Sequence, residues 1–331
     1  MKLGIALPHY DISFPDQQPA TFDRIARYAE LAESLGFHQA WMSDHVWMDL
    51  ERYGGPPGRQ GTPECIATLA GLSQLTSRVR LGSLVLANGL RPPTILAKTL
   101  ATLDRLAGGR LDVGIGAGWN AAEFTENALD FPRPGERIAR LEEALGVLRA
   151  LLGGDGTFVG RYYRAEAAPV VPGPVQRPWP PLWVGGKGDR LLGVVARAAD
   201  GWNLSWQVDE AFYADRSAVL DAACRAAGRD PAAVRRTLGL NTLVGTDEED
   251  VEARWRALVR WTPGGILDGV ELRDWARGRL VGTPDQVLDQ LRRWEAVGIE
   301  QVICNFGNLP FVLPDPEQAE IVAERVLDRL R

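Results

Sequence analysis

Short apolar segments alternate with segments of helical periodicity along the whole of this 331-residue chain. The first unit shows the pattern: residues 2–7, KLGIAL, are typical of a buried strand, and residues 21–35 place apolar residues along one helical face. Repeated strand–helix units predict a parallel sheet with helices outside it, and eight of them close naturally into a barrel. We therefore predict an α/β fold, a (β/α)8 TIM barrel, with a doubly wound open sheet as the alternative. The predicted strands are 2–7, 39–43, 79–86, 110–115, 181–186, 200–205, 238–245 and 300–306.

One stretch breaks this rhythm. Residues 153–180 are rich in Gly and Pro and too irregular for a barrel helix. We interpret them as an insertion after the fourth unit, with a short hairpin around Phe158–Tyr163, and expect them to help cover the barrel mouth. The prediction is a single barrel domain over residues 1–331 that carries this insertion.

Composition excludes several classes of function. The net charge of −6 argues against a nucleic-acid or anionic-membrane partner, and no apolar run reaches membrane-spanning length. Three cysteines far apart, with no metal-ligand spacing, suggest a reducing compartment, and we expect a cytoplasmic protein. Three histidines make a zinc or di-iron site improbable, so no metal site is predicted.

The segment RLDVGIGAGWNAAEF, residues 110–124, contains a relaxed dinucleotide fingerprint from Gly116 to Ala121. A dinucleotide-binding turn needs a second strand that ends in an acidic residue about 20 positions later. The acids at that distance, Glu136 and Glu142, lie in a helical pattern instead. We expect Gly116 and Gly118 at the carboxyl end of the fourth strand, either admitting a flat ligand or relieving crowding at the rim.

Other strand ends carry candidate functional residues. The second strand ends in Asp44-His45, where a carboxylate beside an imidazole could handle a proton, although a capping Asp with a solvated His is the simpler interpretation. His9, after the first strand, is expected at the same face, with an inactive rim histidine as the alternative.

The fifth strand ends in VGGKGDR, residues 184–190, which predicts an anion site at a helix N-terminus or an ordinary tight turn. Its residues Gly185, Gly186, Lys187, Gly188 and Arg190 are the candidates for binding a phosphate. Several tryptophans also fall at predicted strand ends, where they could line a slot for a planar ring or simply pack the loops; they are Trp47, Trp119, Trp202 and Trp206.

With these residues in place, the chain resembles the luciferase-like flavin and deazaflavin oxidoreductases, and within them the branch that uses coenzyme F420. The run from 95 to 124 is long and specific, and the matching segments keep the family's order along nearly the whole chain. They are WMSDH (41–45), VRLGSLVL (79–86), ILAKTLATLDRLAGGRLDVGIGAGWNAAEF (95–124), PPLWVGGKGDRLL (180–192), AADGWN (198–203) and VGTPDQV (281–287).

The resemblance implies a (β/α)8 barrel in which Asp44 and His45 face the deazaflavin and His45 serves as base or proton relay. It implies a cis peptide against the ring at Leu84-Val85, or else at Ser83-Leu84, with the glycine loop at the phosphate. Gly116, Gly118 and Trp119 are then assigned to the cofactor, His9, Trp47 and Trp206 to the substrate pocket, and Glu123 to a structural role.

The implied reaction is hydride transfer between C5 of F420 and a small organic substrate, catalysed by a homodimer. Sugar-phosphate dehydrogenases of this branch have Glu where this chain has Trp119, and Trp where it has Asp49, so that activity is not expected. The alternatives are an FMN-dependent monooxygenase with a separate reductase, and a non-catalytic cofactor-binding barrel. A hydrolase or aldolase barrel would want paired carboxylates or a lysine at the strand ends, and only Lys187 qualifies.

Overall fold

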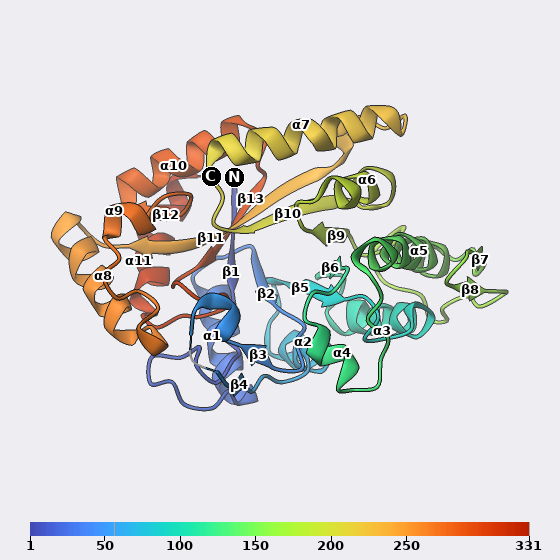
Figure 1. The fold of residues 1–331 in the computed structure, drawn as a ribbon, viewed down its shortest axis with the longest axis horizontal. Coiled ribbons are helices and arrows are strands. Elements are labelled where there is room, and N and C mark those ends of the chain that lie inside the picture. The colour runs from blue at the N-terminus through green and yellow to red at the C-terminus, as the bar shows by residue number, and fades with distance from the viewer. Residues whose placement is uncertain (56, 331) are drawn as a thin grey trace.

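The computed structural model describes residues 1–55 and 57–330, and its centre is a closed barrel of parallel strands (Figure 1). Each strand pairs with the next in the predicted order, and β10 also pairs with β11, which closes the circle. The TIM-barrel prediction is therefore confirmed. The eight barrel strands are β1 (Lys2–Ala6), β2 (Gln39–Met42), β5 (Arg80–Ala87), β6 (Leu111–Gly116), β9 (Leu182–Gly185), β10 (Gly201–Trp206), β11 (Arg235–Val244) and β13 (Gln301–Asn305).

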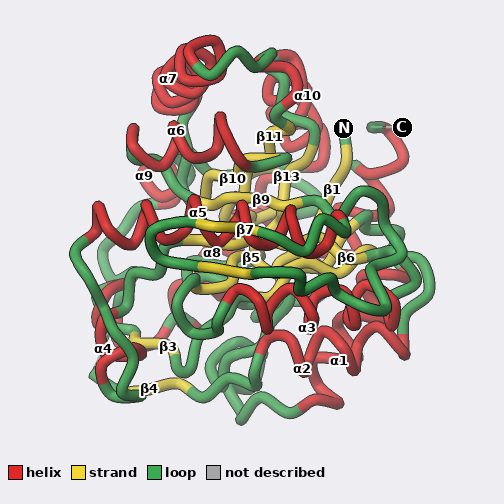
Figure 2. Tube along the Cα trace, turned by 90° about the vertical axis from the view of Figure 1, so that its right-hand side faces the viewer, coloured by secondary structure: helices red, strands yellow, loops and turns green. Residues whose placement is uncertain are grey.

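Helices surround the barrel, and Figure 2 shows the strands in the middle with helices above and below them. Each covering helix buries an apolar stripe: in the first, Ile25, Ala29 and Ala32 are completely buried. The main helices are α1 (Phe22–Ser34), α2 (Cys65–Leu75), α3 (Pro93–Leu106), α5 (Pro134–Gly153), α6 (Asp189–Ala198), α7 (Glu210–Ala226), α8 (Glu248–Trp261), α10 (Pro284–Ala296) and α11 (Glu317–Arg325).

Short elements decorate the loops. Strand β12 (Leu280–Gly282), which the sequence did not predict, pairs with the outer end of β11, where Thr242 stands opposite Leu280. Because it is only three residues long, it offers no periodicity to detect. The others are β3 (Met48–Asp49), β4 (Arg59–Gln60), α4 (Ala121–Thr125), α9 (Leu272–Trp275) and the 3₁₀ turns η1 (Glu51–Tyr53), η2 (Pro231–Ala233), η3 (Pro263–Gly265) and η4 (Leu327–Arg329).

The segment 153–180 forms the predicted hairpin, from β7 (Phe158–Val159) and β8 (Arg164–Ala165), but it lies outside α5 and α3 rather than across the mouth (Figure 1). The hairpin loop is held from α5, where the Glu143 carboxylate accepts from three consecutive backbone N–H groups, those of residues 161–163. Further on, Asp104 of α3 accepts from the N–H groups of residues 175 and 176, near the amino end of β6. The expectation that this segment helps cover the mouth is wrong, because these contacts hold it against α5 and α3 on the outside of the barrel.

None of the helices within the described ranges is long and apolar enough to span a membrane.

Candidate active site

A cavity of about 180 Å³ lies at the carboxyl ends of the barrel strands. Its walls come from the ends of β1, β2, β5, β6 and β10 and from the loop after β13. The sequence places candidate residues at this end of the barrel, where TIM-barrel active sites lie. The lining residues include Tyr10, Ser43, Asp44, His45, Met48, Tyr53, Leu84, Val85, Gly118, Trp119, Glu123, Phe124, Ser205, Trp206 and Phe311.

Strand β5 bulges into this cavity. The peptide between Leu84 and Val85 is cis, as the resemblance implies, and the register against β6 shifts between Ser83 and Leu86. The Val85 side chain occupies the space that the glycines of the neighbouring strand leave free. A Cβ at Gly114 would lie 2.1 Å from the Ser83 carbonyl oxygen, and one at Gly116 would lie 2.8 Å from a Val85 methyl carbon.

These distances explain the glycines of the fingerprint-like segment. They make room for the β5 bulge, so they serve packing inside the barrel rather than a dinucleotide turn. Gly116 is absent from the cavity lining, whereas Gly118 belongs to it and has a φ of 73°.

His45 points into the cavity and is held by a glutamate from the other side of the mouth. Its Nδ1 lies 2.9 Å from Oε2 of Glu123, and the same carboxylate accepts from the Val46 N–H at 2.5 Å. Glu123 is buried, while 15% of the His45 side chain is exposed. Because a carboxylate on Nδ1 favours the tautomer with its proton there, Nε2 is left as the nitrogen available to a ligand. Glu123 therefore positions His45, a role that the sequence did not reveal.

Asp44 has a different partner from the one expected. It does not fix His45: its two oxygens accept from Nη1 and Nη2 of Arg91, at 2.7 and 2.9 Å, and from the Ala87 N–H at 3.0 Å. Consecutive side chains of an extended segment point to opposite sides, so Asp44 faces β5 while His45 faces the cavity. The bidentate pair ties the end of β2 to the loop after β5.

His9 lies behind the cavity wall and is completely buried. Its Nδ1 is 2.7 Å from the Leu7 carbonyl oxygen, its Nε2 is 2.9 Å from Oγ of Ser43, and the same hydroxyl contacts the Tyr10 hydroxyl. Burial lowers the pKa of His9 to about 3 and raises the pKa of Tyr10 well above its ordinary value. His9 is thus a neutral support beneath Ser43 and Tyr10, and does not line the cavity as expected.

The tryptophans divide into two groups. Trp119 and Trp206 line the cavity; the first lies 5.4 Å from the His45 ring, edge to face, and is covered by the Arg52 guanidinium. Trp206 packs edge-on against Phe311 and follows a second cis peptide, which the sequence did not predict. Trp47, predicted for the substrate pocket, is outside the lining and stacks under the Arg59 guanidinium, while Trp202 is buried and donates to the Gly186 carbonyl oxygen.

The glycine loop continues from the bulge. Gly185 adjoins Val85, Gly186 has a φ of 139°, and Gly188 caps α6, where an added Cβ would meet nothing within 4 Å. This open helix N-terminus can accept an anion. Lys187 lies over the Phe212 ring and Arg190 reaches toward Gly135 of α5, so the two cations flank the loop without converging on one point.

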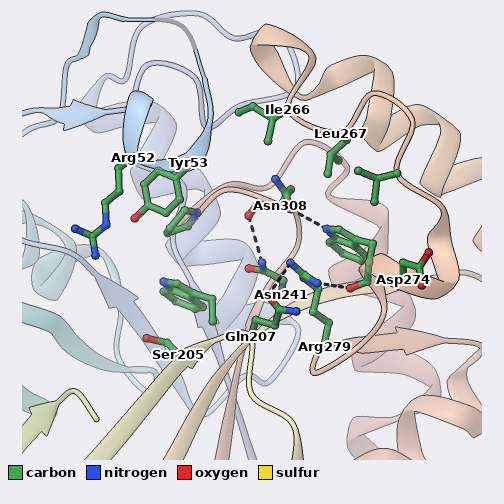
Figure 3. A pocket seen from close by; sticks show the side chains of 14 residues that line it. Arg52, Tyr53, Ser205, Gln207, Asn241, Ile266, Leu267, Asp274, Arg279 and Asn308 are labelled. Atoms are coloured by element: carbon green, nitrogen blue, oxygen red, sulfur yellow. Dashed lines mark hydrogen bonds between the residues drawn. The ribbon is translucent and has the colours of Figure 1, made fainter. Parts of the chain in front are cut away.

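A larger cavity of about 600 Å³ opens beside the first (Figure 3). The two share walls made by Tyr53, Ser205, Trp206 and Pro310, so together they form one cleft over the mouth. An apolar slot next to a glycine loop fits a flat ring with an anionic tail, and the adjoining space leaves room for a second molecule.

The comparisons with known proteins agree with this geometry. A family model described as luciferase-like monooxygenase matches residues 1–301. A phthiodiolone/phenolphthiodiolone dimycocerosates ketoreductase from Mycobacterium kansasii is 28% identical, over 86% of this chain and 91% of that protein.

Two solved structures also superimpose on the chain. The monooxygenase RslO1 from Streptomyces bottropensis is 25% identical, covers 100% of both chains and has a TM-score of 0.76. A coenzyme F420-dependent tetrahydromethanopterin reductase from Methanopyrus kandleri shares the fold, with a TM-score of 0.72 at 23% identity over 96% of this chain and 99% of that one.

Proposed function

Because this chain belongs to the luciferase-like monooxygenase family, an oxidoreductase and monooxygenase family, we propose that it is an F420-dependent oxidoreductase. It would transfer a hydride between C5 of the deazaflavin and a small organic substrate, with His45 as the proton relay. The observation that carries the proposal is the Glu123–His45 couple: it leaves Nε2 of His45, a side chain that lines the cavity, without a hydrogen-bond partner among the described residues.

The chain offers residues for each part of such a cofactor. Leu84, Val85, Gly118 and Trp119 would hold the ring, and the loop from Gly185 to Arg190 would bind the phosphate tail. When bound, F420 supplies a carbon that gives or accepts a two-electron hydride.

His45 supplies the other half of the reaction. Reduction of a carbonyl group places a hydride on carbon and a proton on oxygen, and oxidation of the alcohol removes both. His45 Nε2 can give or take this proton at the cavity, while the Glu123 carboxylate stabilises the charged ring when the proton is on it. The similarity to a ketoreductase supports a reaction of this kind.

An FMN-dependent monooxygenase supplied by a separate reductase is the second candidate. The match to the monooxygenase RslO1 over the full length of both chains favours it, and the same slot and glycine loop would suit FMN. A barrel that binds such a cofactor without catalysis is the third possibility.

Titration of the purified protein with F420 and with FMN separates these functions. We expect F420 to bind, which a change in its fluorescence would report. We also expect the absorbance of F420 to fall when alcohols from a substrate panel are added, because their oxidation reduces the cofactor. Tight FMN binding without F420 binding would overturn the proposal. F420 binding with no turnover of any alcohol or ketone would favour the non-catalytic barrel.

A further inference from the structure

The larger cavity contains an arginine that the proposed reaction does not use. Arg279, from the loop before β12, lines this cavity together with Asn241, Asn308 and Trp275 (Figure 3). We propose that Arg279 binds an anionic group of the substrate, a carboxylate, so that the substrates are organic acids whose reacting carbon lies toward His45. The inference rests on the proposed function for the position of the reacting carbon only.

The charge of Arg279 is uncompensated within the described residues. The guanidinium donates to the Trp275 carbonyl oxygen and, at 3.4 Å, to Oε1 of Gln207, while its Nε is buried without a partner. No carboxylate of the described chain forms an ion pair with it. Asp274 lines the same cavity, but its carboxylate pairs with Arg277 at 2.9 Å. A half-buried cation that has only neutral partners favours an incoming anion, because the pair replaces interactions that the cation lacks.

Burial also lowers the pKa of Arg279, to about 10, and no acid among the described residues opposes this effect. The guanidinium still carries its charge at neutral pH, and the Gln207 amide makes the longest of its contacts. A carboxylate that enters the cavity can displace that amide and meet the guanidinium edge with two oxygens, which is the arrangement that the planar fork of arginine favours.

The rest of the cavity suits an amphiphilic acid. Apolar side chains of Ile266, Leu267 and Val270 form one wall, and Trp206 forms the partition shared with the His45 cavity. Across the cavity, Arg52 also has no ion-pair partner among the described residues, and it stacks on Trp119. A molecule with a carboxylate at Arg279 and an apolar middle along this wall would extend toward His45.

The test compares apolar carboxylates with uncharged analogues. Hexanoate, octanoate and decanoate, and their primary amides, are titrated into the cofactor-free wild-type protein, and binding is followed by tryptophan fluorescence, because Trp206 and Trp275 line the cavity. We expect each acid to bind about tenfold tighter than its amide, since hydrogen bonds to charged groups are the strong ones. In Arg279→Gln this preference should fall to about twofold or less.

Two further variants test whether the preference for acids depends on the charge and shape of Arg279. Arg279→Lys keeps the charge without the fork and should retain part of the preference, provided that its unfolding midpoint stays near that of the wild type. Arg273→Gln is the matched control, because Arg273 is exposed and outside the lining, and it should keep the full preference. Equal binding of acids and amides by the wild type, or a preference that survives in Arg279→Gln, would overturn the proposal.

A last measurement tests whether Arg279 binds an anionic group of the substrate or the anionic tail of the cofactor. The affinity for F420 and for FMN is measured in Arg279→Gln and should remain within about twofold of the wild-type affinity. A tenfold loss there would assign Arg279 to the cofactor tail and overturn the substrate assignment. The acid–amide comparison uses no cofactor and no turnover, so its result stands even if the proposed hydride transfer fails.

Discussion

The two ends of the barrel each bury a carboxylate that pairs with an arginine, and they use it differently. At the amino end, Asp112 accepts from Gln39, from Arg80 Nε at 2.6 Å and from Trp183 Nε1 at 3.1 Å. At the carboxyl end, Asp44 accepts from Arg91.

Beyond these pairs the ends differ. The donors around Asp112 close the barrel floor, whereas the second couple at the mouth, Glu123 and His45, keeps one ring nitrogen free toward a cavity. The buried carboxylate at the floor has its donors within the protein, although Gln39 Oε1 and the side-chain amide of Gln301 are buried there without partners. The mouth differs because its unpartnered nitrogen belongs to a side chain that lines a cavity. Substitutions at the floor should therefore act on stability, and substitutions at the mouth on turnover.

The largest effect is expected at the mouth. His45→Ala should lower kcat for hydride transfer by about 10²- to 10⁴-fold, because it removes the proton relay. It should also lower the free energy of unfolding by about 1–3 kcal/mol, because the buried Glu123 carboxylate loses a donor. Steady-state kinetics and urea unfolding measure the two quantities. His38→Ala, at the start of β2 on the barrel floor, is the matched control and should leave kcat unchanged. Unchanged turnover in His45→Ala would remove this residue from the mechanism.

At the floor the effect moves to stability. Asp112→Ala should lower the free energy of unfolding by about 3–5 kcal/mol, because it leaves Arg80 unpaired beside two unsatisfied donors. Urea unfolding measures this loss. Asp16→Ala, which breaks the exposed contact with Arg24, should leave the urea midpoint close to that of the wild type. A similarly small change in Asp112→Ala would mean that the floor network does not stabilise the barrel.

Two histidines, one near each end of the barrel, should make the free energy of unfolding depend on pH. Burial lowers the pKa of His9 from 6.5 to about 3, so the folded state resists a proton that the unfolded chain accepts. The contribution of neutral His9 is complete above pH 6.5 and is lost as the pH falls from there toward 3. At pH 5 the loss is about 2 kcal/mol.

A variant isolates this contribution. His9→Gln should flatten the decline of the free energy of unfolding between pH 6.5 and pH 4, measured by urea unfolding at each pH. At the floor, burial lowers the pKa of His38 to about 4, but that ring is partly exposed, so His38→Gln should flatten the decline less. Parallel profiles of His9→Gln and the wild type would show that His9 does not resist protonation in the folded state.

The sequence predicts the frame of this molecule better than the side-chain contacts at either end of the barrel. Eight strands in the right order follow from local periodicity, and a hairpin around residues 158–163 follows from composition. The cis peptide at Leu84-Val85 lies at one of the two positions that the family resemblance implies. The Asp44–Arg91 and Glu123–His45 contacts could not be found in this way, because the partners are 47 and 78 residues apart. Placing Asp44 on His45 failed for a simple reason: neighbours along an extended chain point apart.

Among the contacts that the sequence did not reveal, the one between Glu123 and His45 matters most for the proposed reaction. Glu123→Gln keeps an oxygen that can accept from the Val46 N–H and from His45 Nδ1, but it removes the negative charge. We expect kcat to fall about tenfold with KM unchanged, because the ring keeps its place and loses the charge that stabilises its protonated form. Steady-state kinetics of the wild type and the variant measure both constants. Glu126→Gln, at the end of the same short helix on an exposed pair with Arg59, is the matched control and should leave kcat within about twofold.

A double-mutant cycle distinguishes positioning from a general structural effect. If Glu123 acts through His45, adding Glu123→Gln to His45→Ala should lower kcat no further, since the residue through which it acts is already gone. A purely structural Glu123 would lower turnover by the same factor in both backgrounds, with a matching loss in the free energy of unfolding. Additive losses in the cycle would therefore return Glu123 to the structural role that its sequence motif implies, and would leave the free nitrogen of His45 without a partner that prepares it.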